Sequence, residues 1–304
     1  MKHHYPNYAA VHFEEFHQRL IDNYDARKDF WMNKAFPKSP KNALNSAFDE
    51  SMKIFALKQF VDRTEFNSIN DLNIANCSGI SHYRLNVNNG KPMQFTVEGK
   101  TFQTIGQYTE DFFYFDRWLR HLCIAITLRD NAALQFLCSI KKEAFQNVRL
   151  ANMPIDDVLM DFIQGMFDPE ADHRSLILNM MESTGPENYT QMRANYVAQI
   201  LLPMANLFMM ALTNVDEEKY HDVWRNAVSS HQEYWSSDTE LAEDYQGWIS
   251  FPILAASVLM FDKKGYKLPT ELSDAEKIYV PEWLVYGDFE PQPSVGVDFY
   301  EGEV

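Results

Sequence analysis

The residues best suited to catalysis are a histidine and an aspartate that follow each other at His221 and Asp222. An adjacent His–Asp pair on a helix can hold a divalent metal for phosphate hydrolysis, if a distant histidine and a later aspartate join it. His173 upstream and Asp262 downstream could complete such a set. Short motifs of this kind match many unrelated sequences, and no second pair supports this one. We therefore favour an exposed or capping pair near a helix start, close to Asp216.

Other catalytic patterns are weaker still. His231 and Glu233 are two positions apart on an expected helix, so they point to different sides and cannot easily share one metal. The sequence has no Gly-rich phosphate loop, no Gly-x-Ser-x-Gly and no His-Glu-x-x-His. Its three cysteines lack metal-ligand spacing and are expected to be reduced and buried: Cys77, Cys123 and Cys138. We expect no catalytic residues, no metal and no cofactor.

Two stretches of the sequence carry acidic residues and neither Lys nor Arg. Residues 154–172 hold Asp156, Asp157, Asp161, Asp168, Glu170 and Asp172, and residues 278–304 hold Glu282, Asp288, Glu290, Asp298, Glu301 and Glu303. The simplest interpretation is a solvated face and a solubilising tail. The functional interpretation is a surface complementary to a basic partner, with aromatic anchors at Phe162, Phe167, Phe289 and Tyr300.

The overall charge points to the same kind of partner. The net charge is -16, which disfavours nucleic acid and anionic membrane surfaces as ligands and favours a basic protein. The first residues lack the apolar core of a signal peptide, and the apolar stretch from Ile200 to Leu212 is too short to cross a bilayer. We therefore expect a cytoplasmic protein that does not bind membranes.

The sequence predicts that the elements that position these residues are helices almost throughout. Apolar residues recur at spacings of three and four, and the composition of 46% hydrophobic residues supports a real core. Between the helices, short β-type runs are expected at His82–Val87, Gln94–Val97 and Thr101–Ile105, with Asn-Gly and Glu-Gly turns. From Ser273 the chain is expected to be extended. The predicted fold is all-α, either stacked αα-hairpins or a helical bundle, with a small β-hairpin insert and an extended C-terminal strap.

We divide this fold into residues 1–106, the N-terminal helices with the hairpin, and residues 107–304, packed together as one globular unit. The second part resembles the immunity protein 49 family of bacterial polymorphic-toxin systems, over roughly residues 105–286. The resemblance lies in an ordered set of features: Trp118, Arg129-Asp130, Leu137-Cys138, the apolar helix Pro203–Leu212, the segments Ser230–Trp235 and Gly247–Pro252, and the closing Tyr279–Val285.

The resemblance implies an antitoxin that binds and neutralises a cognate toxin or effector acting in the cytosol, and it carries no catalytic residues. The acidic residues, Asp156, Asp157, Asp161, Asp168, Glu170, Asp172, Asp288, Glu290, Asp298 and Glu301, are then the candidate toxin-binding residues. The motif residues themselves are mostly apolar, so we expect Tyr279 and Trp283 to fix the C-terminal segment and Asp130 to cap a helix. Three alternatives stay open: the neighbouring immunity proteins of polymorphic DNase toxins, a metal-dependent HD-type phosphohydrolase, and a generic helical scaffold.

Overall fold

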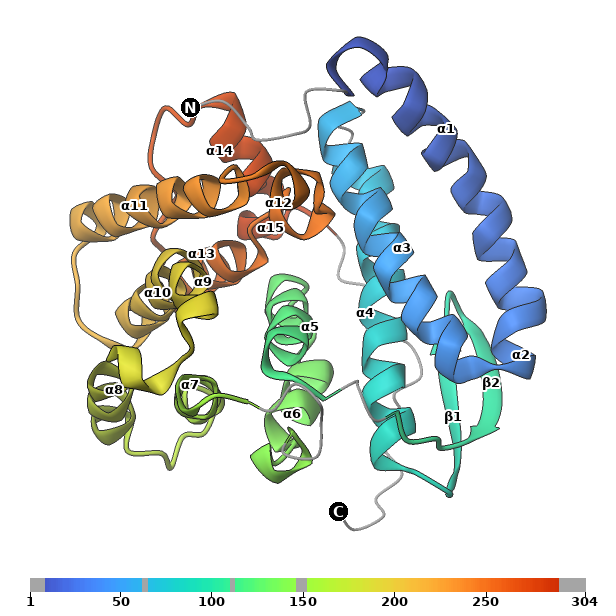
Figure 1. Ribbon diagram of the computed structural model, residues 1–304, viewed down its shortest axis with the longest axis horizontal. Coiled ribbons are helices and arrows are strands. Elements are labelled where there is room, and N and C mark those ends of the chain that lie inside the picture. Colours follow the sequence, from blue (N-terminus) through green and yellow to red (C-terminus); the bar gives the residue numbers. More distant parts are fainter. Residues whose placement is uncertain (1–8, 62–64, 110–112, 146–151, 290–304) are drawn as a thin grey trace. The chain divides into compact units, whose positions relative to one another are not determined.

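The computed structural model describes residues 9–61, 65–109, 113–145 and 152–289, and most of these residues lie in helices (Figure 1). A two-stranded antiparallel sheet accompanies the helices. The predicted all-α fold with a small hairpin insert is therefore confirmed. The chain forms two compact units: the hairpin unit, whose main segments are His12–Thr109 and Arg129–Ala133, and the large unit, built mainly from Glu110–Leu128 and Leu134–Phe289. That the two parts pack as one globular unit stays a prediction.

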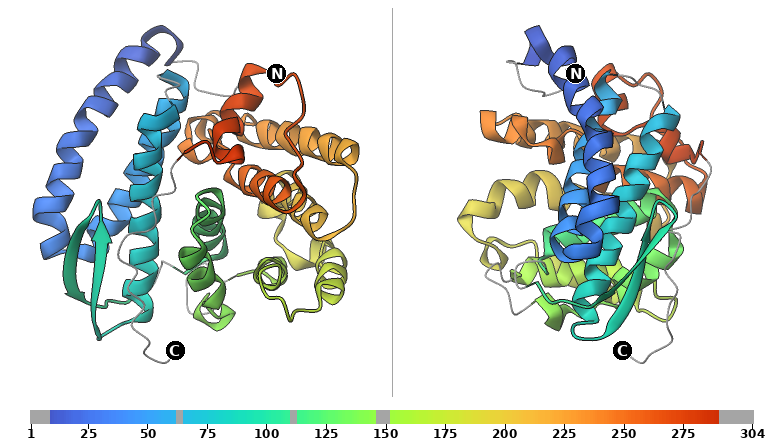
Figure 2. Two further views of the ribbon diagram at one scale, coloured as in Figure 1. Left: turned by 180° about the vertical axis from the view of Figure 1, so that it is seen from behind. Right: turned by 90° about the vertical axis from the view of Figure 1, so that its right-hand side faces the viewer.

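The hairpin unit consists of long helices and the small sheet. Helix α3 packs against α4, and the hairpin lies along α4 (Figures 1 and 2). Its elements in chain order are α1 (Ala9–Phe30), a π-helical turn (Trp31–Ala35), α2 (Phe36–Lys38), α3 (Pro40–Val61), α4 (Glu65–Val87), β1 (Pro92–Val97) and β2 (Lys100–Ile105).

The β-hairpin closes through the Glu-Gly turn that the sequence predicts. Glu98 and Gly99 both have positive φ, at 47° and 73°, as a two-residue turn between twisted strands requires. The register places Phe95 opposite Phe102, and the two rings stack at 5.3 Å between centroids. Both rings also meet Phe36 edge-on, so this aromatic cluster fixes the hairpin to the helices.

The predicted strand at His82–Val87 is wrong, because these residues form the last turns of α4. Tyr83 and Leu85 are fully buried there, and the side-chain amide of Asn86 donates to the carbonyl of His82, four residues earlier, at 2.8 Å. Packing of a helix within the fold has overridden the weak local β propensity of the run.

The large unit is an assembly of shorter helices. Its helices are α5 (Phe115–Thr127), α6 (Asn131–Ser139, which begins in the hairpin unit's segment), α7 (Pro154–Gly165), α8 (His173–Glu182), α9 (Ala194–Tyr196), α10 (Leu202–Leu212), α11 (Glu217–Trp235), α12 (Thr239–Glu243), α13 (Phe251–Lys264), α14 (Asp274–Tyr279) and α15 (Glu282–Tyr286). Short 3-10 turns lie at Lys142–Phe145, Pro186–Asn188, Gln191–Arg193 and Tyr245–Gly247, and a π-helical turn at Val197–Leu201.

Helix α13 is the core of the large unit. Every residue from Ile253 to Met260 is buried, and α5, α10 and α15 pack against this helix. A helix that is apolar on all sides is stable only when other elements surround it. The expected break between α5 and α6 is also confirmed, and Asp130 caps α6 by accepting from the amide of Ala133 at 3.0 Å.

Both π-helical turns have the same cause in the sequence. The amide of Phe36 donates to the carbonyl of Trp31, and that of Leu202 to the carbonyl of Val197, so each bond spans five residues instead of four. A proline follows each donor, at 37 and 203. Because proline lacks an N–H and its ring clashes with the carbonyl four residues earlier, the wider turn relieves that clash within a continuing helix.

The segment after Ser273 forms α14 and α15, so the prediction that it is extended is wrong. Ser273 and Glu276 make a capping box, in which the Glu276 carboxylate accepts from the Ser273 amide at 2.8 Å. Pro281 separates the two helices, and Gly287 ends the second with a left-handed φ of 70°. Tyr279 and Leu284 are fully buried, so the expectation that this segment is fixed to the core holds.

The helical run from Gln191 to Leu212 is longer than the apolar stretch considered above. It has 22 residues, and an 18-residue window within it has a mean hydropathy of 1.4, so it is long and apolar enough to cross a membrane by length and composition alone. Half of that window is buried inside the protein, as in the core helix of many globular domains, and Arg193 near the start of the run is ion-paired.

Candidate functional site

The acidic residues of 154–172 lie on α7, on the loop after it and at the start of α8. The structure separates them into two groups. Asp156 belongs to the interior, because only 2% of its side chain is exposed. The other five are exposed or half-exposed: Asp157, Asp161, Asp168, Glu170 and Asp172. Asp156 therefore cannot contact a partner, and we no longer assign it to a binding surface.

Asp156 is part of an ionic cluster that arises from three distant parts of the sequence. Arg193 donates to Asp156 at 2.5 Å through Nη1 and to Asp116 of α5 at 2.7 Å through Nη2. The Asp156 carboxylate also accepts from the amide of Met153, which caps α7. We name Asp116, Asp156 and Arg193 the Arg193 cluster.

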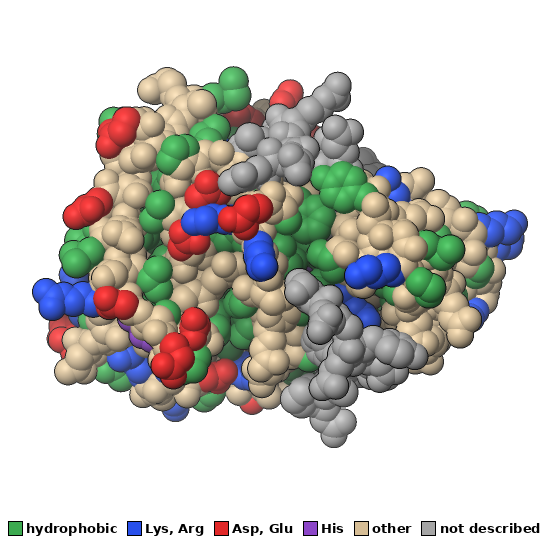
Figure 3. All heavy atoms as spheres, turned by 90° about the horizontal axis from the view of Figure 1, so that it is seen from below, with side chains coloured by type: hydrophobic (Ala, Val, Ile, Leu, Met, Phe, Trp, Pro, Cys, Tyr) green, Lys and Arg blue, Asp and Glu red, His purple; other side chains and the backbone are tan. Residues whose placement is uncertain are grey.

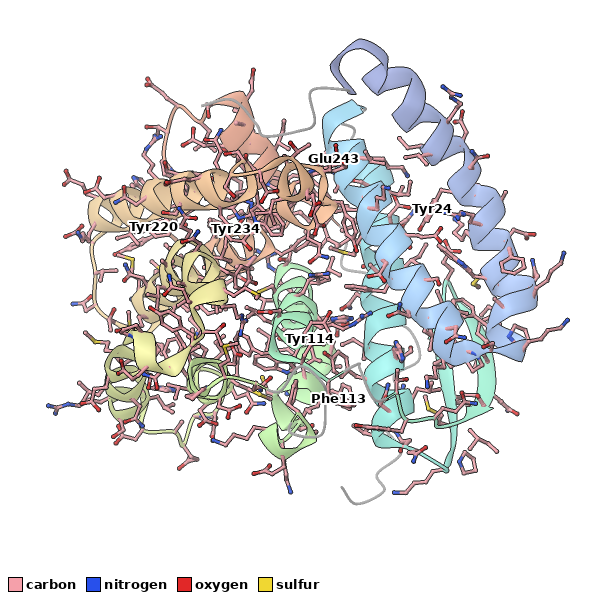
Figure 4. All side chains as sticks on the ribbon, viewed as in Figure 1. Tyr24, Phe113, Tyr114, Tyr220, Tyr234 and Glu243 are labelled. Carbon is pink, nitrogen blue, oxygen red and sulfur yellow. The ribbon has the colours of Figure 1, made fainter. Side chains whose placement is uncertain are left out.

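Burial dominates the electrostatics of the Arg193 cluster. Desolvation raises the pKa of both Asp116 and Asp156 above the ordinary value, although Arg193 beside them lowers it in part. The hydroxyl of Tyr196 hydrogen-bonds Asp116, and Tyr234 of α11, labelled in Figure 4, packs edge-on against the Tyr196 ring. These contacts join α5, α7, α9 and α11, so the cluster is structural.

Asp157 and Asp161 are half-exposed on α7 and have partners within the protein. Asp157 accepts from the side-chain amide of Asn152 at 3.0 Å, and Asp161 forms an ion pair with Lys142 at 2.6 Å. Burial is low around Lys142, so solvent screens this pair and it adds little stability. Each carboxylate is nevertheless partly occupied before any partner arrives.

The most exposed carboxylates are Asp168, Glu170 and Asp172, between α7 and α8. Asp168 accepts from the amide of Glu170, and Asp172 caps α8 by accepting from the amide and the hydroxyl of Ser175. The hydrogen bonds from Ser175 lower the pKa of Asp172, so this residue stays negative. Figure 3 shows acidic side chains scattered among hydrophobic, basic and other polar ones on the left half of this view.

The second acidic stretch lies largely beyond the described residues. Asp288 is exposed just after α15, whereas Glu290, Asp298 and Glu301 fall outside the part of the chain that the structure describes. Of the expected aromatic anchors, Phe162 and Phe289 are buried and cannot reach a partner. Phe167 is half-exposed with Lys263 over its ring, and Tyr300 lies outside the described residues.

One group of exposed apolar residues was not predicted from the sequence. In the described part of the large unit, the exposed large hydrophobic side chains are Leu178, Met181 and Met192. Leu178 and Met181 lie on α8, where apolar residues outnumber the positions that can face α7. A helical projection of residues 173–182 would have revealed this excess, because apolar residues occupy both faces of that short helix.

The residues of the possible metal site have other roles. Across the described ranges, no three His, Cys, Asp or Glu side chains come together as metal ligands. His173 binds the carbonyl of Gly165 at 2.9 Å, and His221 binds the carbonyl of Lys267 at 3.1 Å. Asp222 and Asp262 are exposed. The geometry thus gives no support to the phosphohydrolase alternative.

The motif segments that carry the family resemblance meet in the interior. The buried His231 donates to the carbonyl of Gly247 at 2.8 Å and packs edge-on against Tyr279. The amide of Ser250 donates to the carbonyl of Tyr279 at 2.9 Å. Trp235 covers Gly247 so closely that a Cβ there would lie 2.3 Å from its ring. The contacts among these motif residues are internal and maintain the fold.

Comparison with known proteins agrees with this motif set. No match is found among curated proteins or among solved structures. Residues 41–284 match the family model described as Immunity protein 49, which is most of the chain and starts well before residue 105, where the motif resemblance begins. The hairpin unit is therefore largely included in the match, and the chain belongs to the immunity protein 49 family.

Proposed function

We propose that this protein is an immunity protein that binds a basic toxin stoichiometrically in the cytosol and so protects the cell that makes both. The observation that carries the proposal is membership of the immunity protein 49 family. The interior role of the family motifs supports binding rather than catalysis, because His231, Gly247 and Tyr279 are occupied with one another.

The distribution of charge indicates which unit meets the toxin. Basic and acidic residues nearly balance over residues 12–109, with 12 Lys and Arg against 11 Asp and Glu, whereas residues 110–289 hold 14 Lys and Arg against 28 Asp and Glu. A basic protein is therefore attracted mainly to the large unit. Attraction of this kind raises the association rate and orients the two proteins before they touch.

Inhibition by binding differs from inhibition by catalysis in its stoichiometry. An inhibitor of the proposed kind occupies one toxin molecule and is not released to act on another. The residual toxin activity then falls linearly with added inhibitor until the two are equimolar. An enzyme that modified the toxin or its product would act at far lower ratios and would continue with time.

The test uses the protein encoded by the gene beside this one, purified after its toxicity has been verified in cells that lack this chain. Titration of the toxin with the full chain should reach complete inhibition at a fixed molar ratio that does not change with incubation time. Co-expression of both proteins in the cytosol should restore growth. Loss of toxin activity at a small fraction of that ratio, or no complex at micromolar concentrations, would refute the proposal.

A further inference from the structure

We propose that the outward face of helix α8, with Leu178 and Met181 at its centre and the neighbouring carboxylates as its rim, is the surface that docks the toxin. This inference rests on the proposed function and assigns it a surface. We name this surface the α8 face: Leu178, Met181, Met192, Asp168, Glu170 and Glu182. The partner it fits is a basic protein with an apolar recess.

The first argument is where the exposed apolar side chains lie. Leu178 is 48% exposed, Met181 56% and Met192 95%, and these are the exposed large hydrophobic residues in the described part of the large unit. Leu178 and Met181 are three residues apart, so they share one side of α8. Single exposed apolar residues are common, but their concentration in one short stretch is typical of an interaction site. Methionine suits such a site because its flexible side chain adapts to a partner.

The second argument is that α8 is fixed from the opposite side. The Nε2 of His173 binds the carbonyl of Gly165 at 2.9 Å, and Leu176 occupies the space that a side chain at Gly165 would need, since a Cβ there would lie 2.2 Å from the Leu176 side chain. Met180 is buried. The inward side of the helix is thus locked on α7, and the outward side is presented without needing to be ordered on binding.

The third argument is charge. Residues 154–192 contain eight acidic residues and one basic residue, Arg174. Asp168, Glu170 and Glu182 are exposed and flank the apolar residues along the chain. A polar rim around an apolar centre is the usual anatomy of a protein interface. Exposed Arg174 also lies on the Leu178 side of α8, but the excess of carboxylates favours a positively charged partner. A second copy of this chain would set acid against acid, so it fits this surface poorly.

The anchoring of Met192 also follows from described contacts. Arg193, the next residue, is bound to Asp156 at the start of α7, and α8 packs on that same helix. Both ends of the 178–192 stretch are therefore attached to α7. This attachment holds Met192 in place although its own side chain makes little contact with the protein.

The test compares two double variants of the full chain against the toxin encoded by the neighbouring gene. Leu178→Ser with Met181→Ser removes the centre of the α8 face without adding charge. The control, Phe30→Ser with Ile105→Ser, removes two side chains of the hairpin unit that are equally exposed, at 52% and 57%. Circular dichroism and thermal unfolding of both variants verify that each is folded.

We expect the α8 variant to bind the toxin at least tenfold more weakly than the unchanged chain, and the control to change affinity less than threefold. If the unchanged chain binds and neither variant differs from it, or if only the control weakens, the α8 face is not the docking surface while the proposed function stands. If the unchanged chain does not bind the toxin, the proposed function itself fails. Self-association of the unchanged chain that the α8 variant abolishes would identify a second copy as the occupant and overturn the inference.

Discussion

Arg193 reaches across the large unit to Asp156, and the Nη1 and Oδ2 atoms of the two residues are 2.5 Å apart. The pair joins the start of the apolar run Gln191–Leu212 to the first turn of α7, and Asp116 of α5 accepts from the same guanidinium. Asp156, which the sequence analysis groups with the surface carboxylates of residues 154–172, is thus a buried partner in an ion pair. The pair matters for stability because removing either residue would leave the charge of the other buried and uncompensated.

Replacing Arg193 by methionine should lower the free energy of unfolding by about 3 kcal/mol, the usual loss when one partner of a buried ion pair is removed. The cause is the charge of Asp156, which would stay buried without its cation. Urea unfolding at neutral pH measures the change. The double variant Arg193→Met with Asp156→Asn should recover part of the loss, since no charge is left at position 156 and the amide oxygen can still cap α7. Equal effects of Arg193→Met in both backgrounds would show that the two residues are not coupled.

Because His231 is buried, we expect the protein to lose stability in mild acid. Burial lowers its pKa to about 4 from the ordinary 6.5, although the hydrogen bond to Gly247 works in the opposite direction. The unfolded chain binds a proton between about pH 6.5 and 4, whereas the folded protein does not, so stability falls as the pH falls through that window. Below pH 4, the protonation of this one residue on unfolding lowers the free energy of unfolding by about 3 kcal/mol relative to neutral pH.

The comparison protein for this measurement is His231→Gln. Its amide can donate to the Gly247 carbonyl but does not titrate. Urea unfolding at several pH values between 7 and 4 should show a shallower pH dependence for the variant, with lower stability than the unchanged chain at pH 7. The same slope in both proteins would mean that His231 does not take up a proton on unfolding.

Much of the fold follows from local sequence patterns. The helices, the Glu98-Gly99 turn, the Asp130 cap and the buried C-terminal aromatics all rest on spacing or residue type. The two wrong predictions have physical reasons. The run from His82 has enough β propensity to suggest a strand but packs as a helix. The prolines after Ser273 favour an extended chain, but the capping box between Ser273 and Glu276 starts a helix there.

The candidate site was less predictable, because exposure depends on contacts between distant residues. Nothing near Asp156 in the sequence indicates that Arg193 will cover it, and nothing near Asp161 indicates its pairing with Lys142. Composition identified the acidic stretch, but only the packing of α8 on α7 separates Leu178 and Met181 from the buried Met180. Charge could be predicted from the sequence. A helical projection of α8 shows more apolar residues than one face can hold, but it does not show which of them α7 buries.

Gly247→Ala should destabilise the protein through a clash with one rigid ring. A Cβ at this position would lie 2.3 Å from Trp235, and three ring atoms surround it. Overpacking of a core costs about 1–3 kcal/mol. The control is Gly185→Ala, where a Cβ would meet only the end of the flexible Glu187 side chain, which can move away. Thermal unfolding should show a clear fall in melting temperature for the first variant and little change for the second; equal falls would contradict the steric explanation.

Local charge on the α8 face should control the association rate with the toxin. Glu170→Lys with Glu182→Lys reverses two exposed carboxylates, and Asp222→Lys with Glu233→Lys makes the same change of net charge on α11. Because salt screens charges over ~10 Å at 0.1 M, the first variant should associate several-fold more slowly than the second at low salt, and the difference should shrink as salt is added.

A third variant, truncated after Phe289, keeps the buried contact of that ring with Trp283 and tests the C-terminal acidic residues separately. Stopped-flow association at two ionic strengths measures all three. Equal slowing by both reversals would indicate net charge alone, slowing only on truncation would move the contact to the C-terminal residues, and no slowing in any variant would mean that the acidic surface only keeps the protein soluble.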